Sequence, residues 1–298
     1  MDFDADGRMD VLTGSWPGQL YLFRCNADGS YNPGETIKDS EGEELKTQSA
    51  STVFATDWDA DGDLDLLTGN IRGEVHLVTN QGNRKEPSYG KPLRLEISDE
   101  LKDRRGDSGP IAADWDGDGL QDVLVGTGEG SVILFRNIGS TEKPELEGGK
   151  VLVEKSPVAW KWEDRKPGQW GARVKIHVTD WNGDGRLDLL LGDRSGSVIK
   201  NPQLNAEQRE AAEEAGQQLA VLRKQMSEAR SSIRKLESQV KDGGDDVAAK
   251  EKSLASLKEE LDKLSETYVA TKKLSEATQP TRQTRNGFVW LFLRKGSE

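Results

Sequence analysis

Short apolar runs of strand length recur along most of this 298-residue chain, and each run is bounded by glycine or polar residues. Runs of this length with such boundaries are typical of β-strands rather than helices. One order repeats: a strand, an acidic loop, a second strand that ends in glycine, a small-residue turn and a third strand. The second strands are expected at residues 10–14, 65–69, 122–126 and 188–192, and the third strands at 18–24, 73–78, 130–136 and 287–294.

Two further segments complete the repeating unit. A first strand is expected before the later loops, at residues 51–55, 110–113 and 175–178. In two copies a tail strand follows the third strand, at residues 93–95 and 151–153. The loops begin 55, 57 and 66 residues apart. Four-stranded units repeating at such a period predict the blades of a β-propeller.

The acidic loops share the pattern D-x-[DN]-x-D-G-x-x-D. Alternate positions supply hard oxygen ligands, and the glycine lets the backbone turn so that the seventh carbonyl and the last carboxylate complete a calcium site. The chain is therefore predicted to bind up to four calcium ions. The predicted ligands are Asp2, Asp4, Asp6, Arg8 and Asp10; Asp57, Asp59, Asp61, Asp63 and Asp65; Asp114, Asp116, Asp118, Leu120 and Asp122; and Asp180, Asn182, Asp184, Arg186 and Asp188, with the seventh residue of each set contributing its carbonyl.

The EF-hand, which opens with the same letters, is excluded. An EF-hand needs a bidentate glutamate at loop position twelve and a helix on either side. Position twelve reads Thr13, Thr68, Val125 and Leu191, and strand-like residues follow each loop. The other alternative, acidic surface turns without metal, is disfavoured because closely spaced carboxylates repel one another when nothing neutralises them.

Four such loops in register with the strands resemble the FG-GAP or VCBS-type repeats of integrin-α-like β-propellers, which are common in bacterial secreted proteins. The resemblance covers the chain except for about residues 202–285. It implies that each ion lies at the turn between the first and second strands of a blade and is chiefly structural. Asn182 is the one departure from aspartate ligation.

The predicted fold is mainly β, with propeller blades over residues 1–201, a helical insertion at 202–285 and a returning strand at 286–298. The first strand is missing from the first repeat and the tail strand from the last, so both blades are expected to be incomplete. We interpret the chain as an arc of a larger ring. A closed ring of four blades is the alternative.

The insertion has helical periodicity. From Ala212 to Val240 the apolar residues alternate three and four positions apart, which is the spacing of a coiled-coil seam. Asn205 and Gln208 form a predicted capping box, residues 242–246 break the helix, and a second seam runs from Val247 to Tyr268. These features predict an antiparallel coiled-coil hairpin, which either is self-contained or also serves dimerisation or docking.

Composition limits the possible functions. The net charge of −12 reflects the acidic loops, and the chain has no basic patch that would favour nucleic acid. A single cysteine, Cys25, excludes an internal disulfide framework, and no apolar run is long enough to span a membrane. Weak calcium loops suit millimolar calcium, which predicts a secreted, periplasmic or cell-surface protein although no leader sequence is evident.

The sequence favours an interaction or adhesion module for a protein or polysaccharide ligand. The alternative is the accessory or catalytic part of a secreted carbohydrate-active enzyme, although no catalytic motif is present. Trp160, Trp162 and Trp170 form either a stacking platform for a ligand or the packing of a blade edge. A recurring aromatic residue inside each loop is expected to wedge between blades: Phe3, Trp58, Trp115 and Trp181.

Overall fold

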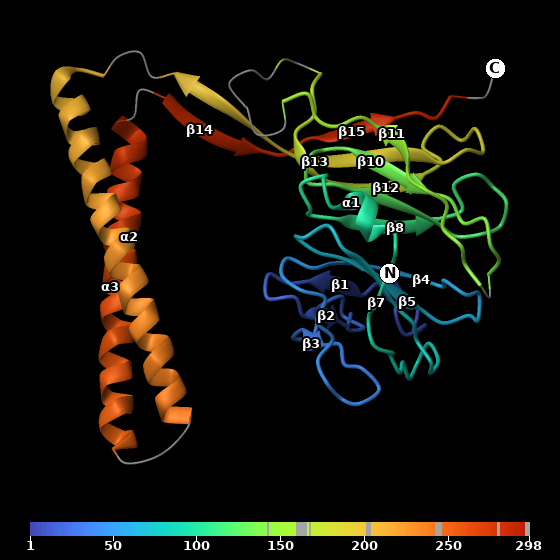
Figure 1. Ribbon diagram of the computed structural model, residues 1–298, viewed down its shortest axis with the longest axis horizontal. Coiled ribbons are helices and arrows are strands. Elements are labelled where there is room, and N and C mark those ends of the chain that lie inside the picture. The colour runs from blue at the N-terminus through green and yellow to red at the C-terminus, as the bar shows by residue number, and fades with distance from the viewer. Residues whose placement is uncertain are drawn as a thin grey trace. The chain divides into compact units, whose positions relative to one another are not determined.

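The computed structural model describes residues 1–141, 143–158, 166, 168–200, 204–241, 246–278 and 281–295. The chain divides into two compact units. One consists of Met1–Ser197 and Arg285–Glu298 and is mainly β, and the other, Val198–Thr284, is mainly α. Both units are visible in Figure 1.

The first three repeats each form one antiparallel sheet whose strands follow the order of the sequence. The first sheet contains β1 (Val11–Gly14), β2 (Leu20–Phe23) and β3 (Glu35–Thr36). The second contains β4 (Thr52–Thr56), β5 (Asp65–Gly69), β6 (Val75–Val78) and β7 (Leu93–Arg94). The third contains β8 (Gly109–Ala113), β9 (Asp122–Gly126), β10 (Val132–Phe135) and β11 (Lys150–Val153). The predicted repetition of sheets is confirmed.

The fourth sheet corrects one part of the sequence interpretation. It contains β12 (Ala172–Thr179), β13 (Asp188–Lys200), β14 (Thr281–Asn286) and β15 (Val289–Phe292). The predicted end of this second strand at residue 192 is wrong, because β13 continues without a break to Lys200. Ser195 is buried and its hydroxyl donates to the Asp193 carboxylate, so this segment is held inside the sheet. The third-strand position beside β13 is taken by β15.

Two short elements were not predicted. β3 completes the first sheet, but its Glu-Thr sequence has no alternation of apolar and polar residues that would indicate a strand. Helix α1 (Ser98–Leu101) lies between the second and third sheets in sequence. Leu101 is buried in the core, and the Ser98 hydroxyl donates to the Val75 carbonyl of β6. Both elements depend on tertiary contacts rather than on a local pattern.

The core lies between consecutive sheets. Phe3, Leu22 and Tyr89 belong to a buried cluster that joins the first and second sheets. Trp58 and Phe135 belong to the cluster that joins the second and third. Further apolar side chains join the third and fourth sheets. Each sheet is therefore stabilised by its neighbours in the sequence.

In the first three sheets the glycine at the end of the second strand has a packing role that the sequence alone did not reveal, whereas Gly192 in the fourth sheet has no such close contact. A Cβ atom on Gly14 would lie 2.1 Å from the Ser51 carbonyl oxygen, and one on Gly69 would lie 2.4 Å from that of Ser108. A Cβ on Gly126 would lie 2.5 Å from the Val174 carbonyl oxygen. In each case the close backbone belongs to the next sheet or to the residues leading into it. Glycine is required because any side chain would force neighbouring sheets apart.

The helical unit contains α2 (Ala206–Lys241) and α3 (Val247–Thr278), which pack against each other. The predicted capping box is confirmed: Gln208 N–H donates to Asn205 Oδ1 at 2.8 Å, and Asn205 N–H donates to Gln208 Oε1 at 3.0 Å. The two helices run antiparallel, because Arg223 contacts Tyr268 whereas Glu237 pairs with Lys258. The buried residues of α2 all lie on the predicted seam: Ala215, Leu219, Leu222, Ala229 and Ile233.

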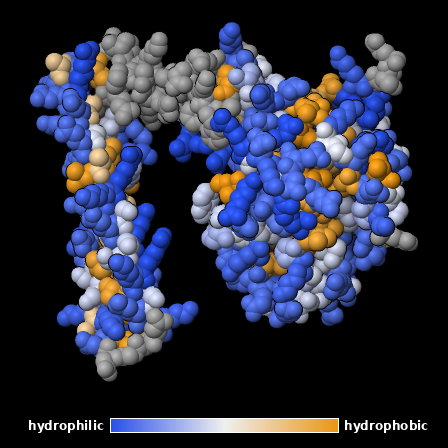
Figure 2. Space-filling model, viewed as in Figure 1, coloured by the Kyte–Doolittle hydropathy of each residue, from blue (hydrophilic) through white to orange (hydrophobic). Residues whose placement is uncertain are grey.

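The visible face of this helical hairpin is mostly polar with scattered apolar patches (Figure 2), and Val221, Val269 and Leu274 are exposed. None of the helices in the described part of the chain is long and apolar enough to cross a membrane. Supercoiling of the pair stays a prediction.

We expect the β unit to fold without the hairpin, because β13 and β14 are paired neighbours and already bring the two ends of the insertion together. Val198–Thr284 would be replaced by an Asn-Gly turn. The midpoint of β-sheet unfolding, followed by near-UV circular dichroism, should change by less than about 2–4 °C, the shift that about 1 kcal/mol produces in a domain of this size.

The matched control is Leu222→Asp in the full chain, which places a charge in the helical seam. It should remove helical signal and leave the β-sheet transition unchanged. Loss of the sheet transition in either variant would contradict an independently folding β unit.

Candidate metal centres

The four acidic loops have the same backbone conformation, fixed by hydrogen bonds from the loop to its own carboxylates. In every loop the first aspartate accepts the N–H of the sixth residue, a glycine, at 2.9–3.1 Å. The fifth aspartate accepts the N–H of the seventh residue at 2.8–3.0 Å. The sixth-position glycines all have positive φ, between 81° and 94°, which explains why glycine is required there. Backbone N–H groups of the turn therefore fix the side chain of the first aspartate in each loop.

The ninth aspartate has a structural role that the motif alone did not indicate. Its Oδ2 accepts the N–H of the loop's second residue, and its Oδ1 accepts an N–H at the end of the third strand. For Asp65 the donors are Trp58 at 3.1 Å and Asn80 at 2.7 Å. The same pair of bonds recurs at Asp10, Asp122 and Asp188. This carboxylate therefore ties each loop to the far side of its own sheet, and its predicted metal ligation stays a prediction.

The loops differ in the ion-pair partners of their aspartates. Arg24, which follows β2, pairs with Asp4, and Arg136, which follows β10, pairs with Asp116. Two seventh-position arginines pair with fifth-position aspartates, Arg8 with Asp6 and Arg186 with Asp184. Sequence reasoning missed Arg24 and Arg136 as part of the sites, because both lie outside the motif, and it gave Arg8 and Arg186 only a carbonyl role.

The loops bring carboxylates close enough to share a cation. Carboxylate oxygens lie within 4.8 Å of one another in three sets: Asp2, Asp4 and Asp10; Asp57, Asp59 and Asp61; and Asp114, Asp116 and Asp118. In the fourth loop Asn182 stands at the third position, and its side-chain N–H donates to Asp184. Buried carboxylate oxygens without any hydrogen-bond donor occur on Asp4, Asp57, Asp59 and Asp63. Such oxygens and an all-oxygen donor set fit a hard divalent cation.

The pKa values of carboxylates in the second and third loops are raised, which means that their charged form is destabilised. Burial, together with the charges of Asp61, Asp59 and Asp57, raises the pKa of Asp63 to about 6. Burial is also the main cause that raises the pKa of Asp65 to about 6, against the hydrogen bonds from Asn80 and Trp58. In the third loop burial raises the pKa of Asp122. Carboxylates with raised pKa values gain most from a cation that stabilises their charged form.

The recurring aromatic residue packs between sheets in three of the four loops. Phe3 and Trp58 are buried, and Trp115 is partly buried against the core of the third and fourth sheets. Trp181 is 60% exposed, and no further sheet covers it in the described part of the chain. The predicted wedge is therefore present wherever a following sheet packs against the loop.

Only one member of the predicted tryptophan platform is described. Trp160 and Trp162 lie outside the described residues. Trp170 donates its indole N–H to the Gly130 carbonyl at 2.7 Å, and its ring meets Phe292 edge to face at 5.8 Å. Trp170 thus takes the packing role, which was the alternative to ligand stacking.

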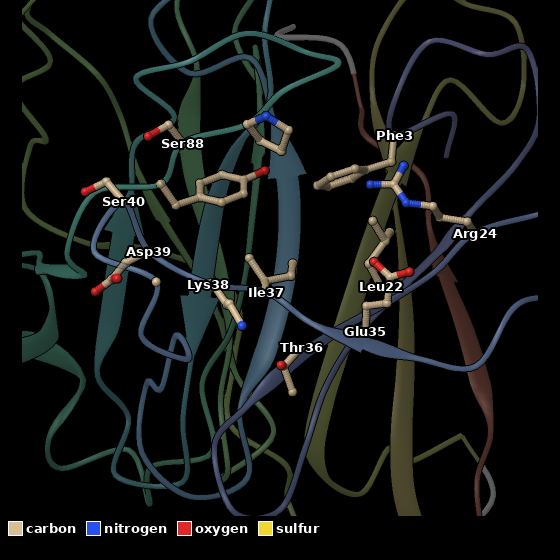
Figure 3. A pocket seen from close by; sticks show the side chains of 13 residues that line it. Phe3, Leu22, Arg24, Glu35, Thr36, Ile37, Lys38, Asp39, Ser40 and Ser88 are labelled. Carbon is tan, nitrogen blue, oxygen red and sulfur yellow. The ribbon is translucent and has the colours of Figure 1, made fainter.

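A cavity of about 470 Å³ lies between the first and second sheets. In Figure 3, Phe3 and Arg24 line one side, and Ser40 and Ser88 line the other. Its apolar lining is Phe3, Leu22, Ile37 and Tyr89, and its polar lining includes Arg24, Glu35, Lys38, Asp39, Ser40 and Ser88. The other loops carry tryptophan where the first carries Phe3, so the smaller ring coincides with the open space.

Comparison with known proteins places these sites in a family. The model of the FG-GAP-like repeat matches residues 2–68, 57–125 and 114–191. Each match runs from one acidic loop to the strand that follows the next acidic loop. These matches together span well over half of the chain. The chain belongs to the FG-GAP-like repeat family.

Three curated relatives are forms of cartilage acidic protein 1. The mouse protein is 30% identical over 133 residues, which is 43% of this chain and 20% of the relative. The human protein is 28% identical over 133 residues and the Xenopus tropicalis protein 30% over 135 residues, with similar coverage. The chain thus spans about a fifth of the length of the curated relatives it matches.

Two solved structures are similar at a TM-score of 0.38, a level that supports no further argument. One is a chain of the Photorhabdus luminescens Tc holotoxin pore, 17% identical, with 64% of this chain and 8% of that chain covered. The other is an Agrocybe aegerita lectin that recognises non-reducing terminal N-acetylglucosamine, 19% identical, with 62% of this chain and 43% of that chain covered.

The raised pKa values predict a pH dependence of stability in the metal-free protein. An unfolded aspartate has a pKa near 3.9, whereas folded Asp63 and Asp65 titrate at about 6. Between these values the folded state holds protons that the unfolded state has released, so these groups lower the free energy of unfolding as pH rises. Asp63→Asn should therefore stabilise the metal-free protein more at pH 7 than at pH 4.5.

Urea unfolding of resin-stripped protein at both pH values measures this difference. Asp99→Asn is the matched control, because ion pairs with Arg94 and Lys102 lower rather than raise the pKa of Asp99. A stabilisation by Asp63→Asn that is equal at both pH values would contradict the raised pKa.

Proposed function

We propose that this chain is a calcium-binding interaction module of β-propeller type that acts outside the cytoplasm. The observation that carries the proposal is the repetition of one loop geometry in which carboxylate oxygens converge within 4.8 Å and some are buried without a donor. Membership of the FG-GAP-like repeat family supports it.

Calcium is the cation that the donor set favours. Each loop offers only carboxylate, amide and carbonyl oxygens, and no histidine or thiol belongs to any of the loops. Hard oxygen ligands in a flexible loop suit calcium, whereas magnesium demands a stricter octahedron and dehydrates reluctantly. Residues at positions one, three, five, seven and nine would hold the ion, as the sequence predicted. Weak sites of this kind are filled where calcium is millimolar, which supports a secreted, periplasmic or cell-surface location.

A propeller arrangement accounts for the packing of the β unit. Each antiparallel sheet contacts the sheets of the preceding and following repeats through buried clusters and close glycine contacts. Every acidic loop precedes the second strand of its sheet, so all loops lie at corresponding ends of their sheets. Metal binding at these turns would stabilise the repeats without occupying the opposite ends, which leaves other surfaces for a protein or polysaccharide ligand.

The cavity beside Phe3 is the ligand site that we propose for this module. Its volume of about 470 Å³ lies in the range of small-molecule sites. Hydroxyl groups of Ser40 and Ser88 and charges of both signs surround an apolar floor. Such a lining suits an uncharged ligand with many hydroxyl groups and an apolar face, such as one sugar unit of a polysaccharide. The helical hairpin remains a separate candidate for dimerisation or docking.

Removal of calcium should destabilise the β unit, because like charges then face each other in every loop. We expect the unfolding temperature to rise with free calcium as the logarithm of its concentration once the sites fill. Asp61→Ala should lose one bound ion per chain, measured by metal analysis after equilibrium dialysis. The control Asp262→Ala removes an acid from helix α3 and should leave the metal content unchanged. A chelator that alters neither unfolding nor metal content would refute the assignment.

Phe3→Trp tests the cavity with a residue that the other repeats already use at this position. The larger ring should occupy part of the cavity while it keeps the wedge between sheets. We expect calcium binding to persist and carbohydrate binding to fall by about tenfold or more, a loss of about 1.4 kcal/mol. The readout is saturation-transfer difference NMR with a panel of neutral mono- and oligosaccharides.

Lys143→Ala, a change in an exposed loop away from the cavity, is the control and should leave any carbohydrate binding intact. Sugar binding that is equal in wild type and Phe3→Trp would exclude this cavity as the ligand site.

A further inference from the structure

The four loops are not electrostatically equivalent, although their backbones are. Where the first and third loops have an aspartate at the third position, an arginine follows the third strand and pairs with it: Arg24 with Asp4 and Arg136 with Asp116. In the fourth loop that position is the neutral Asn182, and Leu293 stands at the arginine position. In these three loops the arginine is therefore present only where the third-position residue is an aspartate.

The second loop departs from this relation. It has Asp59 at the third position, but Thr79 stands where Arg24 and Arg136 stand in the other repeats. Its seventh residue is Asp63, whereas the other loops have Arg8, Leu120 and Arg186 there. Among the residues that the structure describes, no lysine or arginine forms an ion pair with any acid of this loop, although each other loop has at least one such pair.

The buried oxygens point to the same loop. Asp63 is only 4% exposed, and its Oδ1 has no hydrogen-bond partner. Asp57 Oδ1 and Asp59 Oδ1 are also buried and without a partner. In the other three loops only Asp4 has such an oxygen. Buried acceptors without donors are costly, and carboxylates are the most costly of them.

We propose that the second loop is the high-affinity calcium site of the chain, with the buried Asp63 carboxylate as an additional negative charge beside the converging oxygens, and that the other loops bind calcium more weakly because arginines already neutralise them. In the first, third and fourth loops a cation must displace an ion pair or share its carboxylate. In the second loop the cation supplies the only counter-charge. The number of ligand charges is known to set calcium affinity in loops of this type. The ranking rests on the proposed calcium binding.

The repeats provide matched substitutions for the test. Thr79→Arg places an arginine at the position that Arg24 and Arg136 occupy, and it should weaken the tightest calcium site by about tenfold or more. Arg136→Thr makes the reverse change and should strengthen the third site. Calcium affinities of the full chain are measured by competition with a chromophoric chelator, which resolves sites of different affinity.

Single substitutions at the third position assign each affinity to its loop. Asp59→Ala should remove the tightest site, whereas Asp116→Ala should remove a weaker one. Asp63→Leu, which copies Leu120 of the third loop, tests the extra negative charge and should weaken the tightest site without loss of an ion at saturating calcium. Circular dichroism identifies any variant that fails to fold, and the remaining variants still decide the ranking.

The outcomes separate the two proposals. Four sites of equal affinity, or a tightest site that survives Asp59→Ala, would overturn the ranking while calcium binding stands. A tightest site that is unchanged by Thr79→Arg would overturn the role of the arginines. Absence of calcium binding in the wild type would overturn the proposed function, and with it the ranking.

Discussion

Every repeat of the β unit depends on one carboxylate, the ninth residue of the loop. Asp65, Asp122 and their equivalents are almost fully buried, and a buried carboxylate is tolerated only when hydrogen bonds satisfy it. Each has two backbone donors, one from the loop and one from the end of the third strand. Hydrogen bonds to a charged group contribute about 1.5–3 kcal/mol each. This residue fixes the loop relative to the sheet before any cation binds, which preorganises the other carboxylates.

The contacts between sheets then decide how the loops are presented. Gly69 and Gly126 allow the backbone of the next sheet to approach, and the aromatic residue inside each of the first three loops fills the space beside it. Both features recur at the same positions of the repeat, so the relation between one sheet and the next is preserved along the chain. A loop is thus bordered by its own sheet through the ninth aspartate and by the following sheet through the second residue.

The sequence predicted those parts of the molecule that are encoded locally. Short apolar runs and glycine boundaries located most strands, and the Asn205–Gln208 pair located the start of α2. The failures have a common cause. The path of β13 beyond Gly192, the two-residue β3 and helix α1 are determined by partners distant in sequence, and their own residues carry no distinctive periodicity. The motif likewise located the loop acids but did not identify Arg24 and Arg136, which lie about twenty residues away.

A crowded carboxylate site can be neutralised in two ways: this chain has arginine pairs in three loops, and a bound cation is proposed for the second loop. An arginine of the same chain is always present, so it stabilises the loop at any calcium concentration. It also competes with any added cation for the carboxylates. A bound cation neutralises more charge and satisfies several oxygens at once, but only where its concentration exceeds its dissociation constant. Repeats with the same loop conformation can therefore differ in how strongly their stability depends on cation concentration, through a single residue outside the loop. In the proposed ranking, Thr79 in place of an arginine would leave the second loop dependent on a cation.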